Sequence, residues 1–63
     1  MVITRPQIRS VFRRNRGAKA QLARELGVTA ASIHSVILGI IKSEHLVRAV
    51  RQRAMELRAS EER

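Results

Sequence analysis

The sequence contains no cysteine, tryptophan or tyrosine, and Phe12 is its one aromatic residue. Without cysteine the chain has neither a disulfide framework nor a thiolate metal site. His34 and His45 are too few and too isolated to hold a metal, so we expect no metal and no other cofactor. A chain of 63 residues forms one domain at most, and a chain of this size buries only about 60% of its unfolded surface. Its stability therefore depends on tight helix packing or on self-association.

Acidic residues are also scarce, which removes the usual components of an active site. The chain has five of them, and four lie in residues 44–63. There is no carboxylate pair, no Ser/His/Asp or Cys/His arrangement and no glycine-rich phosphate loop. We therefore expect no enzymatic activity, and no small-molecule substrate is evident.

Long apolar runs are missing as well. The longest, residues 36–41, falls far short of the ~20 residues that a membrane-spanning helix needs. No signal-peptide pattern opens the chain. The expectation is a cytoplasmic protein without a membrane partner.

What the sequence does contain is an excess of positive charge. Thirteen Lys and Arg against five acidic residues give a net charge of +8 and an isoelectric point near 11.9. Residues 1–43 hold eight of the basic residues and one acid, so this part alone carries a net charge of +7. Such a concentration indicates an anionic partner. The alternative, a charged coat kept for solubility, would mix both signs along the chain.

Apolar residues recur at helical spacing in four segments, whereas strand and hairpin signals are nearly absent. We therefore predict an all-α fold, a compact four-helix bundle that forms a single domain over residues 1–63. The expected helices span about residues 6–14, 18–26, 30–38 and 44–58, and the polar tail over residues 59–63 is expected to fray.

The helix boundaries follow from residues that cap helices. Thr4, Thr29 and Ser43 can each accept a hydrogen bond from the free N–H groups of the turn that follows. Gly27 and Gly39 are expected to end helices in the left-handed conformation, which glycine adopts without strain.

Residues 19–38, KAQLARELGVTAASIHSVIL, have the spacing of a helix-turn-helix. Such a motif needs a small residue where its helices touch, a glycine in the turn and apolar anchors on the second helix. The segment resembles the motif of phage repressors and Cro-like regulators, which has alanine fifth, glycine ninth and branched apolar residues fifteenth and eighteenth. Ala23, Gly27, Ile33 and Val36 occupy these places. The resemblance implies a lambda-repressor-like bundle that binds double-stranded DNA.

In such a motif the second helix enters the major groove. The predicted base-reading residues are Thr29, Ala30, Ala31, Ser32, His34 and Ser35, although a solvent-facing His34 without a role is the alternative for that residue. Lys19, Lys42 and Ser43 lie at helix N-termini, where free N–H groups and the helix dipole favour phosphate. Five arginines either contact the DNA backbone, which we favour, or form a solvated face: Arg5, Arg9, Arg13, Arg14 and Arg16.

One recognition helix with short polar side chains reads too little DNA to select a site among ~10⁶ or more competitors. We therefore predict a homodimer on an inverted repeat. The expected interface is the apolar surface left after the core is closed: Ile40, Ile41, Val47, Ala54 and Leu57. For Ile40 and Ile41 the alternative is that they close the core against the fourth helix.

The resulting hypothesis is a transcriptional repressor of a phage or mobile-element operon. It leaves open whether the operon controls lysogeny, excision or an anti-CRISPR-associated gene. One alternative is a small basic protein that inhibits a host enzyme, such as RNA polymerase, by protein–protein contact. Another is a membrane-active peptide, which the glycine-punctuated helices disfavour because they indicate a packed fold.

Overall fold

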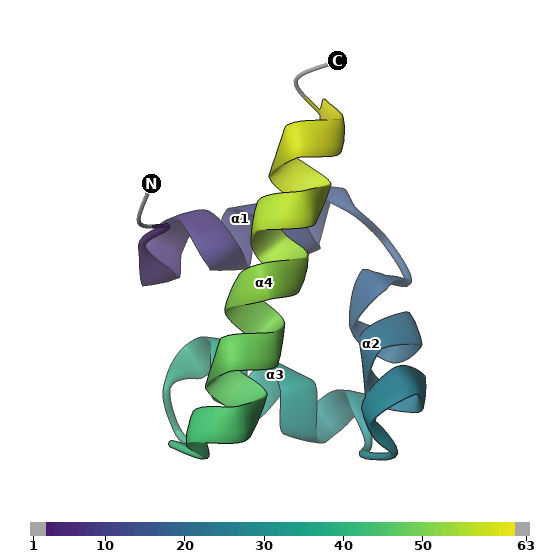
Figure 1. The fold of residues 1–63 in the computed structure, drawn as a ribbon, viewed down its shortest axis with the longest axis vertical. Coiled ribbons are helices and arrows are strands. Elements are labelled where there is room, and N and C mark those ends of the chain that lie inside the picture. Colours follow the sequence, from purple (N-terminus) through teal and green to yellow (C-terminus); the bar gives the residue numbers. More distant parts are fainter. Residues whose placement is uncertain (1–2, 62–63) are drawn as a thin grey trace.

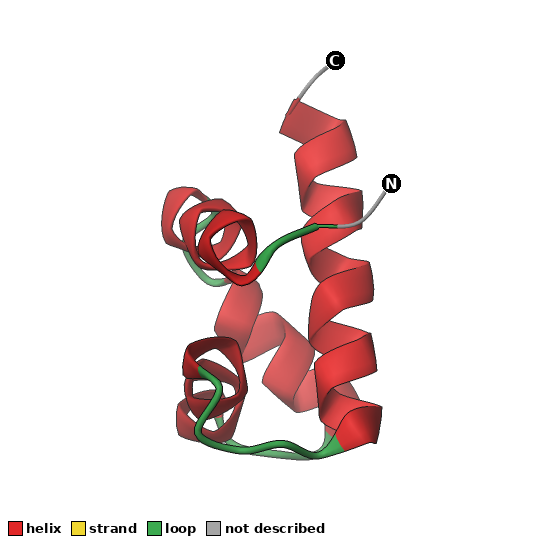
Figure 2. Ribbon diagram, turned by 90° about the vertical axis from the view of Figure 1, so that its left-hand side faces the viewer, coloured by secondary structure: helices red, strands yellow, loops and turns green. Residues whose placement is uncertain are grey.

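The computed structural model describes residues 3–61, which form four helices and no strand. The helices are α1 (Arg5–Arg14), α2 (Ala18–Leu26), α3 (Ala30–Leu38) and α4 (Glu44–Glu61). α4 runs the length of the molecule, with α1 crossing behind its upper half and α3 behind its lower half (Figure 1). Turning the molecule by 90° shows α1 nearly end-on, with α4 extending past it (Figure 2). The predicted all-α, four-helix fold is confirmed.

The caps predicted at Thr4, Thr29, Gly27 and Gly39 are present. Thr4 caps α1, because its Oγ1 accepts from the backbone N–H of Gln7 at 3.4 Å, and Gln7 Oε1 accepts from the backbone N–H of Thr4 at 2.9 Å. This reciprocal pair is a capping box. Gly27 and Gly39 end α2 and α3 with φ of 71° and 83°, in the left-handed region. None of the helices within residues 3–61 has the length and apolar character needed to cross a membrane.

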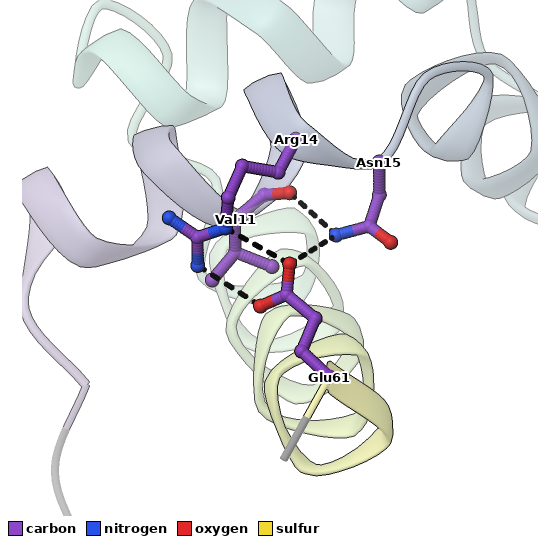
Figure 3. Close-up of polar contacts among 4 residues, drawn as sticks. All are labelled: Val11, Arg14, Asn15 and Glu61. Carbon is purple, nitrogen blue, oxygen red and sulfur yellow. Dashed lines mark hydrogen bonds and ion pairs between the residues drawn. The ribbon is translucent and has the colours of Figure 1, made fainter. Parts of the chain in front are cut away.

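α4 is longer than predicted and continues to Glu61, so the expected fraying is wrong for residues 59–61. The cause is a contact between helix ends (Figure 3). Arg14 donates to both carboxylate oxygens of Glu61, each at 2.9 Å, and Asn15 Nδ2 donates to Glu61 at 3.2 Å and to the Val11 carbonyl at 2.8 Å. These bonds hold the last turn of α4 against the end of α1. Residues 62–63 of the predicted tail lie outside the described residues.

The core lies where the inner faces of the four helices meet. Ile33 of α3 and Ala54 of α4 are completely buried, and no polar or charged side chain is buried among the described residues. The remaining buried apolar residues are Ile3, Ile8, Val11, Phe12, Ala18, Leu22, Ala23, Val36, Ile37 and Val50. Each helix therefore contributes an apolar stripe, as its periodicity predicted.

The backbone of Gly27 gives the first testable prediction. A Cβ added there would meet no atom within 4 Å, so Gly27→Ala changes the backbone energy without a clash. Because a left-handed residue costs an L-amino acid about 1–2 kcal/mol, Gly27→Ala should destabilise the protein by that amount in urea unfolding. Gly27→Asn is the control and should lose less, since asparagine tolerates this conformation. Equal stability of Gly27→Ala and the unchanged protein would contradict the prediction.

The Arg14–Glu61 pair makes stability depend on pH. The hydrogen bond from Arg14 holds the pKa of Glu61 below its usual range. The stabilisation is therefore present above the ordinary glutamate pKa and is lost as the pH falls through the lowered value. Glu61→Gln should lower the melting temperature at neutral pH and flatten its decline on acidification.

Glu44→Gln is the matched control, because Glu44 pairs with Arg48 on the exposed side of one helix, at 3.1 Å. Such pairs contribute little. Melting curves of equal pH dependence for Glu61→Gln and Glu44→Gln would show that the contact between α1 and α4 does not stabilise the fold.

Candidate nucleic-acid interface

The α2–α3 pair forms around Gly27, in the segment that resembles a helix-turn-helix. The N–H of Val28 donates to the carbonyl of Ala23 at 2.9 Å, which folds the chain back at the end of α2. Ala23 and Ile33 are both buried, so the small residue on α2 and the branched residue on α3 lie in the core. This packing turns one side of α3 inward and leaves its other side at the surface.

The outward side of α3 carries the predicted base-reading residues. Ala30, Ala31 and His34 are exposed, whereas Ser32 and Ser35 are half-buried. Thr29 is the N-cap of α3: its Oγ1 accepts from the backbone N–H of Ser32 at 3.1 Å and lies 2.9 Å from the Ser32 hydroxyl. The two hydroxyls are thus engaged with each other. Thr29 is also exposed, so Thr29, Ala30, Ala31 and His34 form the part of this face that is open to a ligand.

Beside this face lies a groove between α1, the start of α2 and α3, which we name the basic groove. Its volume is about 270 Å³, and it is lined by Arg9, Phe12, Arg13, Lys19, His34, Ile37 and Leu38. Lys19 Nζ lies 3.3 Å from His34 Nδ1, so the first turn of α2 touches the outer face of α3. The structure therefore brings three predicted phosphate contacts, Arg9, Arg13 and Lys19, next to one predicted base contact.

The carboxylates of the described residues are all held away from the basic groove. Each forms an ion pair with an arginine: Glu61 with Arg14, Glu44 with Arg48, and both Glu25 and Glu56 with Arg53. Glu25 is the one acid of α2, and it is paired with α4. Consequently no carboxylate among residues 3–61 neutralises Arg9, Arg13 or Lys19, and the groove keeps a positive potential.

The other predicted phosphate contacts lie elsewhere. Arg14 is paired with Glu61 on the α4 side, and Arg16 is exposed in the turn between α1 and α2. Arg5 and Lys42 border a second, mostly apolar hollow of about 790 Å³ between α1, α3 and α4. Ser43 is half-buried, and its carbonyl accepts from the N–H of Val47 at 2.8 Å.

Arg5 has a structural role that the sequence did not reveal. Its guanidinium lies over the backbone of Gly39, so that a Cβ on Gly39 would sit 2.8 Å from Arg5 Cζ. α3 has no basic residue in its own last turn. Arg5 supplies that positive charge from α1, at the helix end where the dipole favours it.

The expected dimer interface is wrong for Ala54, which is completely buried within one chain. Ile41, Val47 and Leu57 are partly buried and pack against the same core. A core this small needs the apolar stripe of α4 to close it, so little of that stripe remains for a partner. Ile40 is different: at 71% exposure it is the one large hydrophobic residue exposed in the described part of the chain.

Two contacts that shape this region, Lys19–His34 and Arg5–Gly39, were missed by the sequence analysis. Both join residues of different helices, and periodicity identifies the face of a helix without identifying the residue opposite it.

Within residues 3–61, no three His, Cys, Asp or Glu side chains gather to hold a metal ion. Comparisons of the chain with family models, curated proteins and solved structures found no match.

Proposed function

We propose that the protein binds double-stranded DNA sequence-specifically, with α3 in the major groove. The observation that carries this proposal is the juxtaposition of the exposed face of α3 with an acid-free basic groove. His34 belongs to both surfaces. A helix of about 10–12 Å diameter fits a major groove about 12 Å wide.

The two surfaces suit the two tasks of a DNA-binding protein. Ala30 and Ala31 can contact thymine methyl groups, and His34 can form a hydrogen bond with a base edge. Arg9, Arg13 and Lys19 lie at the side of α3, where the phosphates that border the major groove would pass. Phosphate contacts supply affinity and fix the orientation of the helix, whereas base contacts supply the sequence preference.

Transcriptional repression is the biological outcome we propose, in a phage or mobile-element operon. The support for it is the resemblance of residues 19–38 to phage repressors and Cro-like regulators. A small DNA-binding domain represses transcription by occupying a promoter, which requires no second domain or catalytic group.

We further propose that two copies bind an inverted repeat, since one α3 reads too few bases to select a single site. Ile40 follows Gly39, the C-cap of α3, and is exposed, so it is suited to contact a second copy. An interface built around one such residue is small. Association is therefore expected to be weak in solution and to become complete on DNA, where both copies are held side by side.

Selection from randomised duplexes tests the central proposal and should enrich one sequence motif. Binding to the enriched site should weaken by roughly 10³ to 10⁵ between about 50 and about 200 mM salt, for ~6–10 phosphate contacts per complex. Arg13→Gln should weaken binding on every sequence and reduce the salt slope by about 0.9 per chain.

Arg51→Gln is the matched control, because it removes the same charge from an exposed position on α4 that borders the apolar hollow. Equal effects of Arg13→Gln and Arg51→Gln would place the contact outside the basic groove. No enriched motif, together with tight binding to a host enzyme such as RNA polymerase, would favour the inhibitor alternative.

The dimer makes a prediction about the geometry of the site. Native mass spectrometry should detect two chains on each selected duplex, and the half-sites should be about 10 base pairs apart from centre to centre. Inserting five base pairs between them should abolish tight binding, because the second half-site then faces the opposite side of the helix. Ile40→Ser should reduce cooperativity without altering the half-site sequence. A single bound chain, or independent binding at both spacings, would refute the dimer.

A further inference from the structure

We infer that His34 reads a purine as a hydrogen-bond donor and that Lys19 is the positioning residue that fixes this state. The inference rests on the proposed DNA binding and deepens it, because it assigns the chemical class of the base that α3 recognises. The contact that carries it joins α2 to α3: Lys19 Nζ lies 3.3 Å from His34 Nδ1.

The chemistry of the two side chains determines the direction of this hydrogen bond. A lysine ammonium has three N–H donors and no acceptor. Nδ1 of His34 must therefore accept, which requires a free lone pair on that nitrogen. The hydrogen of the neutral ring is then on Nε2, since the bond made by one ring nitrogen sets the state of the other.

The remaining polar side chains of the basic groove also favour a neutral ring with its hydrogen on Nε2. Arg9 and Arg13, which line it with Lys19 and His34, are also donors without an acceptor. The carboxylates of the described residues are engaged by Arg14, Arg48 and Arg53 instead. A hydrogen on Nδ1 would thus point at the Lys19 ammonium, which is itself a donor, whereas a lone pair there accepts from Lys19.

The consequence for recognition lies at Nε2. His34 is exposed on the outer face of α3, so the Nε2–H is available to a base edge in the major groove. Both purines present the acceptor N7 there, guanine adds O6 and thymine presents O4, whereas cytosine presents the N4 donor. A donor at Nε2 excludes cytosine, and we assign to His34 in each half-site the acceptor that both purines share, N7. Cytosine opposite the same atom would place two donors against each other.

The state of the ring can be measured in the protein without DNA. ¹⁵N NMR of the His34 side chain should show an unprotonated Nδ1 and a protonated Nε2 in the neutral ring. Lys19→Met removes the donor while keeping a side chain of similar length, and it should shift both signals towards a mixture of the two tautomers. Lys42→Met removes an equal charge from a residue that lines the apolar hollow and not the basic groove, and it should leave both signals unchanged. Identical spectra for Lys19→Met and the unchanged protein would overturn the positioning role.

The base can be identified by replacing each purine of a selected operator with its 7-deaza analogue, which lacks the N7 acceptor. One position in each half-site should lose about 2- to 12-fold in affinity, the effect of one hydrogen bond. A loss with 7-deazaguanine assigns guanine, and a loss with 7-deazaadenine assigns adenine. His34→Ala should be insensitive at that position. In Lys19→Met, the 7-deaza substitution at that position should cost less affinity than in the unchanged protein. In Lys42→Met it should cost the same as in the unchanged protein, although this variant binds all DNA more weakly.

The outcomes separate the inference from the function on which it rests. Selective binding with no purine whose deaza substitution depends on His34 would overturn the inference and leave the proposed function intact. Failure of the unchanged protein to select any DNA sequence would overturn both.

Discussion

The burial of one side of α3 is the constraint on which the rest of the structure depends. α3 packs against α1, α2 and α4, and Ile33 at its centre is completely buried. In a chain of this size the other three helices are all required to cover that side. On the opposite side, Lys19 of α2 contacts His34 while Ala30 and Ala31 stay exposed, and the same packing fixes the orientation of this side. A short helix that would be marginal alone thus becomes a rigid surface that presents Ala30, Ala31 and His34.

The distribution of charge follows from how the few acidic residues are used. Glu25 and Glu56 engage Arg53, and Glu61 engages Arg14, so the carboxylates stabilise contacts that involve α4. The basic residues of the groove between α1 and α3 have no such partner in the described part of the chain. The asymmetry along the sequence therefore becomes an asymmetry between two sides of a small bundle. A long-range attraction towards an anion would act on one of these sides more than on the other.

Most of the fold could be predicted because its signals are local. Thr4, Thr29, Gly27 and Gly39 each act on the adjoining turn, and they placed the start of α1, the end of α2 and both ends of α3. Contacts between distant residues could not be predicted in this way. Arg14 and Glu61 are 47 positions apart, and their bond extends α4 past the expected end. For the candidate site, the sequence identified His34, Lys19 and the arginines of α1 individually. The sequence did not reveal which arginines lie beside Lys19 and His34. Arg9 and Arg13 line the same groove, whereas Arg5 lies at Gly39 and Arg14 pairs with Glu61. The sequence also predicted that Val47, Ala54 and Leu57 of α4 would contact a second copy. In the structure Ala54 is completely buried within one chain, and Val47 and Leu57 pack against the same core.

The position of α4 has a consequence for how the chain acquires its structure during synthesis. Val50 and Ala54 close the core over residues supplied by α1 and α3, which are made first. Until α4 has emerged from the ribosome, Val11 and Ile33 lack the part of their cover that α4 provides, and the core between the earlier helices is incomplete. Residues 1–43, the basic part of the chain, are therefore synthesised before the surface that they form can take up its final structure. Its capacity to present an ordered face to an anionic partner begins only when α4, the last of the four helices to be made, docks.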